Sequence, residues 1–277
     1  MRKPPGARRT VRFGIAFVLC ALGTTPLTER GQVISDGMAE VLRSLRHPQD
    51  GNVLARACVR ALDVTGVSMS LLVGETPQLE LLWFHPVLSR RFEDLQLTLG
   101  EGPGPDAVRT GLAVHAPDLR RVRPDRWPLL VPSAEELGVG GVSCFPLGVG
   151  AVRLGVLTVL CDGRGLSEQQ QVDATVLAAA LTSGALNSAD GSGAVDGYGV
   201  HEERGGLHRA AVHQATGMIS VQLNVPMAQA MLRLRAHSYA SGRPLGEVAA
   251  DVVARRLRFS NDGDDMTGPY SPDGGKG

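Results

Sequence analysis

The segment Leu207–Phe259 constrains the fold most strongly, because it contains three helical patterns separated by two breaks. Apolar residues recur there at three- and four-residue spacings, and the breaks are Asn224–Pro226 and Gly242–Pro244. The first helix is expected over about His201–Leu223, the second begins at Pro226, and the third follows the second break. Helices this short can bury a shared core only as a compact bundle.

The same spacings predict the buried face of each helix. For the first helix these residues are Leu207, Ala211, Gln214, Ala215, Met218, Val221 and Gln222. For the second they are Met227, Ala230, Met231 and Leu234. For the third they are Leu245, Val248, Ala249, Val252, Val253 and Leu257.

Charge is distributed unevenly along a chain that is neutral as a whole, with 28 basic and 28 acidic residues among 277. Between residues 199 and 260 there are eight arginines and four acidic residues, and no acidic residue lies between Arg209 and Arg243. This local excess predicts a surface that binds an anionic partner such as a nucleic acid. A solvated basic helix face is the alternative.

An α+β domain of about 150 residues is expected to precede this bundle. Helices are expected after Ser35 and after Asp50, before Gly111, and over 167–186, where the inner side would carry Val172, Thr175, Val176, Ala179 and Leu186. Strands are expected over residues 67–73, 79–84, 112–116, 142–147 and 154–161. The last two strands would form a central antiparallel pair.

Several ordered blocks in this domain carry a resemblance to a known family. The blocks are LGEGPGPDA ending at Ala107, Gly111–Val114, Asp118-Leu119, Arg126–Pro128 and FPLGVGAVRLGVL beginning at Phe145. Together they resemble the GAF domains of actinobacterial regulators, which are sensor folds with a six-stranded antiparallel sheet and helices on one face. Related regulators often have a cysteine in the first block, where this chain has Gly104, so a thiol sensor is not expected there.

The resemblance implies a small-molecule pocket between the sheet and the loop over residues 100–111. The candidate lining residues are Trp83, Glu101, Asp106, Trp127 and Phe145. Core packing is the alternative for the aromatic residues, and helix capping is the alternative for the two carboxylates. The identity of a ligand or cofactor stays unknown at this point.

The bundle resembles a second family, the ANTAR domain. The residues that carry this resemblance are the A-x-G-M pattern at Ala215–Met218, the run Val225–Ala230 and the R-P-L-x-E-V-A pattern that begins at Arg243. The resemblance implies three helices that bind RNA stem-loops in nascent transcripts as part of an antitermination regulator, usually as a dimer. Where family members often have a lysine, this chain has Thr216.

That departure moves the expected RNA contacts to other positions. The candidate RNA-binding residues are Arg209, Arg233, Arg235, His237 and Arg243. The leading hypothesis is a GAF sensor that controls an RNA-binding module. The alternative is a GAF sensor whose helical bundle mediates dimerisation or binds a partner protein without RNA.

An enzyme is not expected from this sequence. It contains no nucleophile elbow, phosphate-binding loop or paired metal-ligand string. Its four cysteines are far apart, which predicts buried free thiols of a cytosolic protein and not a metal site.

The expected domain boundaries follow from composition. Residues 1–34 form a signal-like or disordered extension with an apolar run over Phe13–Leu22, too short to span a membrane. Residues 35–188 form the GAF domain, 189–200 a linker, 201–259 the ANTAR domain and 260–277 a disordered tail. A cytoplasmic location is favoured over secretion, with translation from Met38 as one explanation of the extension.

Overall fold

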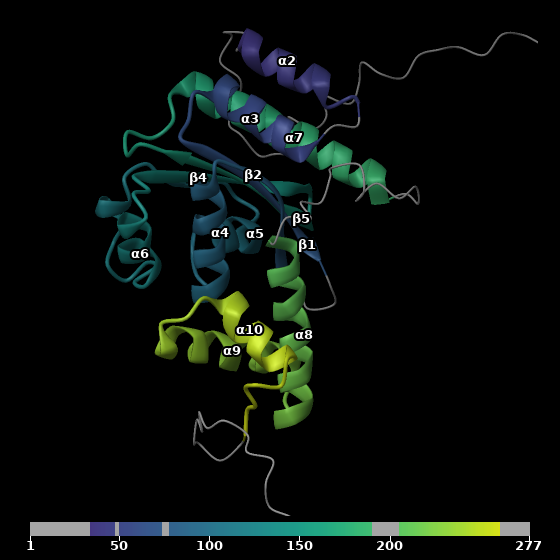
Figure 1. The fold of residues 1–277 in the computed structure, drawn as a ribbon. Helices are drawn as coiled ribbons and strands as arrows, with labels where there is room; N and C mark the ends of the chain where they lie inside the picture. Colours follow the sequence, from purple (N-terminus) through teal and green to yellow (C-terminus); the bar gives the residue numbers. More distant parts are fainter. Residues whose placement is uncertain (1–33, 48–49, 74–77, 190–204, 261–277) are drawn as a thin grey trace, which may run out of the picture.

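The computed structural model describes residues 34–47, 50–73, 78–189 and 205–260, and the side chains of 187–189 and 205–209 are not described. Most of the predicted extension, linker and tail therefore lies outside the described residues. We call residues 34–189 the sheet domain and residues 205–260 the three-helix module (Figure 1). None of the helices in the described part of the chain is long and apolar enough to cross a membrane.

The sheet domain is built on five antiparallel strands with the order β2-β1-β5-β4-β3. The strands are β1 (Gly66–Val73), β2 (Gln78–His85), β3 (Val114–Ala116), β4 (Gly141–Val149) and β5 (Val152–Cys161). The predicted α+β class and all five expected strands are confirmed. The sixth strand implied by the GAF resemblance is not present among the described residues.

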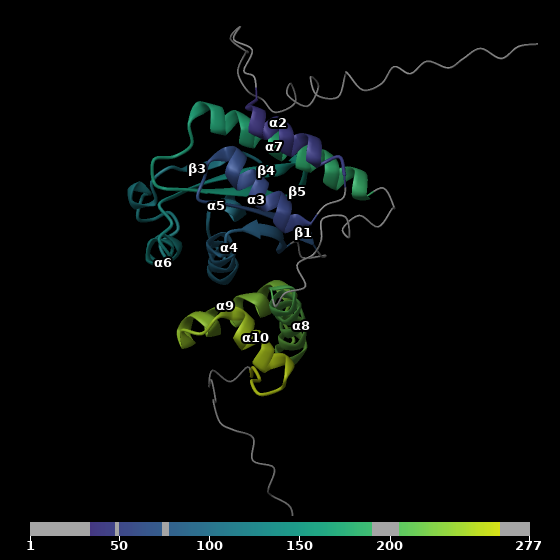
Figure 2. The same ribbon diagram turned by 45° about the horizontal axis from the view of Figure 1, so that its top comes forward.

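Helices cover both faces of the sheet, whereas the resemblance implied one face (Figures 1 and 2). One face carries α2 (Asp36–Ser44), α3 (Gly51–Leu62) and α7 (Glu168–Ala189). The other face carries α4 (Val87–Leu99), α5 (Pro103–Thr110) and α6 (Leu130–Glu136), with the 3-10 turn η1 (Leu119–Arg121) nearby. The sheet is therefore the middle of three layers.

The first two helices begin where the sequence predicts, because each has a local side-chain cap. The Ser35 hydroxyl accepts a hydrogen bond from the backbone N–H of Met38, and the Asp50 carboxylate accepts one from Asn52. The inner face predicted for α7 is wrong, since its fully buried apolar residues are Ala174, Leu177 and Leu181. That helix is apolar on most sides, so periodicity alone does not select a face.

Helix α4 is the main element that the sequence analysis did not predict. Its buried residues are Ser89, Phe92, Glu93 and Gln96, of which only Phe92 is apolar. Leu88, Leu95 and Leu99 pack with Phe92 against the core on this face of the sheet, so the helix does carry an apolar stripe at three- and four-residue spacing. It packs against β1 and β2 and extends beyond the sheet towards the three-helix module (Figure 1).

The three-helix module contains α8 (Gly205–Leu223), α9 (Met227–Ser241) and α10 (Leu245–Val253), as predicted. Its core residues are Val212, Ala215, Ile219, Leu223, Ala230, Met231, Leu234, Leu245, Val248, Ala249, Val252 and Leu257. The face predicted for α8 is partly wrong, because Val221 is 84% exposed and Gln214 also faces solvent. On α9, Met227 is exposed while Ala230, Met231 and Leu234 are buried as expected.

The three-helix module lies directly against the sheet domain. Leu97 of α4 packs against the core of the module, and α4 contacts α9. The Nε2 atom of His213 on α8 contacts Oε1 of Glu80 on β2. The two parts thus share an interface formed by α4 and β2 on one side and by α8 and α9 on the other.

Candidate nucleic-acid interface and the cavity beside it

The predicted RNA-binding residues Arg233 and Arg235 lie on different sides of α9. Two helical residues this far apart in sequence are separated by about 200° around the helix axis, because each residue turns the helix by about 100°. Arg233 is exposed to solvent. Arg235 faces the sheet domain, where its guanidinium group lies over the backbone of Gly100. The two side chains therefore cannot contact one flat RNA surface in this arrangement.

Arg243 is partly neutralised by acidic neighbours on α10. Its Nη2 atom is 2.7 Å from Oδ2 of Asp251, and its Nε atom is 4.0 Å from Glu247. Asp251 also forms an ion pair with Arg256 at 2.6 Å. Hydrogen bonds from Arg243 and Arg256 hold the pKa of the Asp251 carboxyl below its usual value. An RNA phosphate that binds Arg243 would therefore compete with Asp251.

The remaining two predicted RNA-binding residues are His237 and Arg209. His237 is partly buried and forms an edge-to-face contact with Phe259, with ring centroids 5.6 Å apart. The backbone of Arg209 belongs to α8, but its side chain lies outside the described residues. The five predicted residues do not form a single cluster.

Two exposed side chains on α9 were not among the predicted contacts. Leu232 is 64% exposed and Tyr239 is 60% exposed, and both lie on the side of α9 that faces away from the core of the module. Tyr239 offers an aromatic ring on which an unpaired base could stack. In the sequence, these two residues lie outside the apolar stripe of Ala230, Met231 and Leu234, and that position is the signal that predicts their exposure.

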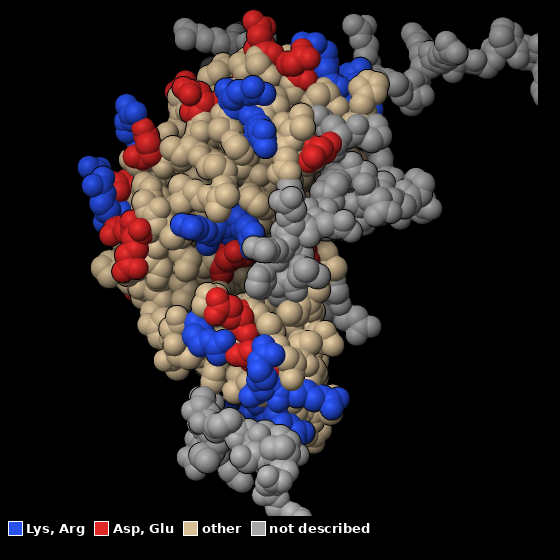
Figure 3. All heavy atoms as spheres, viewed as in Figure 1, with Lys and Arg blue, Asp and Glu red and all other residues tan. Residues whose placement is uncertain are grey.

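The visible surface carries mixed charge over both parts of the molecule. In Figure 3, basic and acidic side chains lie next to each other over the sheet domain, and a larger group of basic side chains lies at the lower end, over the three-helix module. The excess of arginine predicted from the sequence is thus exposed at the module, although some of it is paired with acidic residues.

The predicted pocket residues Glu101 and Asp106 have structural partners. Oε1 of Glu101 accepts hydrogen bonds from the backbone N–H groups of Leu129 and Leu130 at 2.8 and 2.9 Å, at the start of α6. Asp106 accepts hydrogen bonds from Arg109 at 2.9 Å and from the Trp127 indole at 3.1 Å. The contacts of Glu101 match the capping role that was the alternative interpretation, whereas Asp106 lies in the first turn of α5 and accepts hydrogen bonds from side chains.

The three predicted aromatic residues are buried in two different cores. Trp83 and Phe145 belong to the core between the sheet and α2, α3 and α7. Trp127 belongs to the core on the opposite face, and the guanidinium carbon of Arg126 lies 4.2 Å from its ring centroid. Neither of the two cavities described below is lined by any of the five predicted pocket residues. The structure therefore does not assemble them into one pocket.

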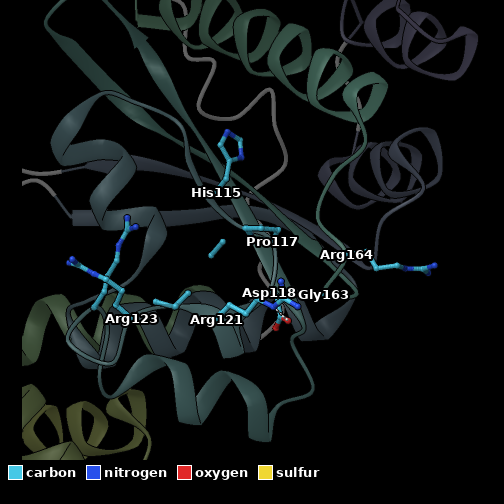
Figure 4. Close-up of a pocket in the computed structure, with 10 residues that line it drawn as sticks. His115, Pro117, Asp118, Arg121, Arg123, Gly163 and Arg164 are labelled. Atoms are coloured by element: carbon cyan, nitrogen blue, oxygen red, sulfur yellow. Dashed lines mark ion pairs between the residues drawn. The ribbon is translucent and has the colours of Figure 1, made fainter.

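The larger cavity, of about 680 Å³, is an open groove beside β3 and η1. Figure 4 shows that the side chains of Arg123 and Arg164 on its rim point away from each other. Arg121 and Arg164 pair with Asp118 and Asp162, respectively. These arginine side chains do not point toward one another, so they do not form a site that could hold an anion in the groove.

The smaller cavity, of about 330 Å³, lies between the sheet domain and α9. Its lining includes Arg235 from α9, Gln96 from α4 and Gln78 from β2. Beside it, Gln96 accepts a hydrogen bond from the N–H of Gly104 at 2.8 Å and donates one to Glu93 at 3.1 Å. This chain of hydrogen bonds ties the start of α5 to α4.

The described cysteines are buried thiols. Cys58, Cys144 and Cys161 are free and buried, as the sequence analysis expected. Burial raises the pKa of Cys58 to about 12 and also raises the pKa of Cys144 and Cys161. Because the thiolate is the reactive form, these side chains are poor nucleophiles at neutral pH.

The structure defines a protein in which an α+β domain is followed by a module of three short helices. Residues 207–253 match the family model of the ANTAR domain, which confirms the resemblance identified in α8, α9 and α10. No curated protein matches the chain.

Solved structures similar to the sheet domain include three bacterial proteins. The GAF domain of a phosphoenolpyruvate-protein phosphotransferase from Coxiella burnetii is 16% identical, with a TM-score of 0.46, and covers 56% of this chain and 97% of its own. The GAF domain of an Acinetobacter phosphoenolpyruvate-protein phosphotransferase is 14% identical, with a TM-score of 0.41, and covers 57% and 95%. A free methionine-R-sulfoxide reductase from Neisseria meningitidis, solved with its substrate, is 17% identical, with a TM-score of 0.42, and covers 56% and 90%.

Proposed function

We propose that this protein is an RNA-binding regulator of transcription antitermination. In this proposal the three-helix module binds stem-loops in nascent transcripts in the cytoplasm, and the sheet domain senses a small molecule or a cellular state. The observation that carries the proposal is the match of residues 207–253 to the ANTAR domain. The protein acts as a binding protein, without a catalytic step, and as a homodimer.

Exposed residues on more than one side of α9 offer groups suited to RNA loops. Arg233 can contact a phosphate, and Tyr239 and Leu232 can contact an unstacked base. Single-stranded loops of RNA present both features to a protein surface. Arg243 can form a second phosphate contact if its ion pair with Asp251 breaks when RNA binds.

The packing of α9 on the sheet domain supports control of RNA binding. Arg235 is held at the domain interface, over Gly100, where RNA cannot reach all of its donors. Separation of the two parts would release Arg235 and uncover Leu97 at the end of α4. A signal that changes the stability of this interface would therefore change the affinity for RNA.

Electrophoretic mobility shifts with a two-stem-loop RNA, measured over a salt series, test this proposal. We expect wild-type protein to bind, and Arg233→Ala to bind more weakly with a salt slope smaller by about 0.7–0.9. Arg91→Ala, which removes an exposed arginine of α4, serves as the matched control. If the wild-type chain binds no such RNA at low salt and forms dimers, the alternative of a dimerising or partner-binding module is preferred.

A further inference from the structure

The cavity between the sheet domain and α9 has the size and the walls of a small-molecule site. Its volume of about 330 Å³ falls at the small end of the range for ligand pockets in proteins. One part of its wall is apolar and is formed by Leu72, Leu79, Leu97, Pro105 and Val108. These side chains would accept a short hydrocarbon group.

Two residues that line this cavity each bury a polar atom that has no partner among the described residues. The Nε atom of Arg235 is a donor, and the Oε1 atom of Gln78 is an acceptor, and neither forms a hydrogen bond with any part of the chain that the structure describes. A buried donor or acceptor without a partner is costly, so such groups are rare in folded proteins. Here the donor and the acceptor belong to two residues that line the same cavity and that come from the two different domains.

The charges around the cavity favour an anion. Arg109, Arg153 and Arg235 line it, together with a single carboxylate, Glu93. Both oxygens of Glu93 already accept hydrogen bonds, from Ser68 at 2.7 Å and from Gln96 at 3.1 Å.

The three arginine side chains differ in the partners that they already have within the protein. Arg109 is paired with Asp106, whereas Arg153 donates to a carbonyl, that of Gly150 at 2.6 Å, and forms no ion pair with a residue that the structure describes. Arg235 is partly buried at the domain interface, and this burial lowers the pKa of its guanidinium group. An anionic group would compensate the charge of Arg235 and Arg153.

We propose that this cavity binds a small organic acid that also carries a hydrogen-bond donor. The carboxylate lies between Arg235 and Arg153, the donor meets the side-chain oxygen of Gln78, and a short apolar chain lies against Leu72, Leu79 and Leu97. A hydroxy acid of about six carbons has all three features.

The site joins the two domains, because Arg235 belongs to α9 and the remaining lining residues belong to the sheet domain. An acid held by Arg235 therefore stabilises the packed arrangement of the two parts. This step rests on the proposed function, in which RNA binding requires the two parts to separate. Because a ligand favours the state to which it binds more tightly, the acid inhibits RNA binding.

Calorimetric titration of the full chain with three related molecules tests the chemistry of the site. The probes are 2-hydroxyhexanoate, hexanoate and 2-hydroxyhexanamide, which share a chain length but differ in charge and in the hydroxyl donor. We expect 2-hydroxyhexanoate to bind best, hexanoate several-fold more weakly, and the uncharged amide at least about tenfold more weakly, because hydrogen bonds to charged groups contribute most.

Variants then assign the contacts. Arg235→Gln should weaken the binding of 2-hydroxyhexanoate about tenfold. Gln78→Leu should make the affinities for 2-hydroxyhexanoate and hexanoate equal. Val108→Phe fills the cavity without removing a polar contact and should abolish binding. Arg91→Gln is the matched control and should bind like wild type. Absence of saturable binding at millimolar concentrations, or binding that Arg235→Gln and Val108→Phe leave unchanged, would overturn the proposal.

The inference and the proposed function can fail separately, because the acid is titrated without RNA. A chain that binds RNA but shows no Arg235-dependent binding of the acid overturns this inference alone. A chain that binds the acid through Arg235 but binds no RNA overturns the proposed function alone. Where both hold, added 2-hydroxyhexanoate should lower the RNA affinity of wild type and not that of Val108→Phe; an unchanged affinity would overturn the inhibitory role.

Discussion

The side chains of His213 and Glu80 form a hydrogen bond that joins α8 to β2 across the domain interface. The two residues are 133 positions apart in the sequence. With the packing of Leu97 against the core of the three-helix module, this bond fixes where α8 lies on the edge of the sheet. The interface therefore includes the apolar contact of Leu97 and the polar contact of His213 with Glu80, besides the packing of Arg235 over Gly100. The first two contacts can each be removed by a single substitution.

Removal of the polar contact should loosen the packing of the two parts. We expect His213→Ala to cost roughly 0.2–1 kcal/mol of interface stability, as for other partly exposed polar pairs. Hydrogen–deuterium exchange should then be faster in the peptide that spans the end of α4. Glu136→Gln, an exposed carboxylate on α6, serves as the control. Equal exchange in wild type and His213→Ala would show that this bond does not hold the domains together.

Asp251 should oppose RNA binding while it stabilises the module. It pairs with both Arg243 and Arg256, so Asp251→Asn releases two arginines and removes one negative charge. We expect RNA affinity at low salt to rise a few-fold and the Tm of the protein to fall. Glu247→Gln is the control, because its ion pair with Arg243 is longer, at 4.0 Å. Weaker RNA binding by a folded Asp251→Asn protein would contradict the competition between Asp251 and RNA.

Asp106 should make the stability of the sheet domain depend on pH in the acid range. Burial alone would raise the pKa of Asp106, but hydrogen bonds from Arg109, Trp127 and Arg126 outweigh this effect and hold the pKa below its usual value. A carboxyl with a lowered pKa in the folded state contributes stability that is present above its unfolded pKa of about 4 and is lost as the pH falls through the folded value.

Thermal unfolding between pH 7 and pH 3 measures this contribution. Asp106→Asn should lower the free energy of unfolding at pH 7 by about 1 kcal/mol and should flatten the loss of stability below pH 4. Asp125→Asn, which removes an exposed carboxylate paired with Arg123, should change neither quantity appreciably. If wild type and Asp106→Asn lost the same free energy of unfolding between pH 4 and pH 3, Asp106 would not be a source of the pH dependence.

The three buried thiols should react only when the protein unfolds. With a pKa of about 12, Cys58 is a thiolate in only about one molecule in ten thousand at pH 8. In a Cys20→Ser background, which leaves three cysteines, a thiol reagent should label none of them rapidly at pH 8. All three should react in denaturant. Rapid labelling of one thiol in the native protein would contradict the burial of these side chains.

Most of the fold follows from local signals in the sequence. Ser35 and Asp50 cap their helices through their own side chains, and the breaks around Pro226 and Pro244 end and begin helices where the pattern predicts. The central pair β4 and β5 is recognised from two long apolar runs joined by a turn. These features depend on residues that are close together in the sequence.

The two helices that were missed make polar contacts with residues that are distant in the sequence. Helix α4 buries Glu93 and Gln96, which are satisfied by Ser68 and by the N–H of Gly104. Helix α6 is capped by Glu101, which lies 28 positions before the first N–H that it accepts. The spacing of Leu88, Phe92, Leu95 and Leu99 is helical and could have located α4, but no pattern within either helix reports these polar partners.

The candidate RNA-binding residues were chosen as basic residues of the ANTAR-like bundle, and a basic residue type does not show which way its side chain points. Helical geometry alone would have separated Arg233 from Arg235, because the two positions face different ways once α9 is accepted as a helix. That Arg235 meets Gly100 of the other domain could not have been predicted, since this contact depends on how the two parts pack.

The five residues from Gly100 to Gly104 hold the ends of three helices at once. Gly100 closes α4 in a left-handed conformation, Glu101 caps α6, and Gly102 precedes α5, whose start is tied back to Gln96. A single inserted residue would have to displace all three helices, and Arg235 with them. In laboratory evolution of this protein, the length of this loop should therefore be among its least variable features, even under selection that freely exchanges the exposed arginines.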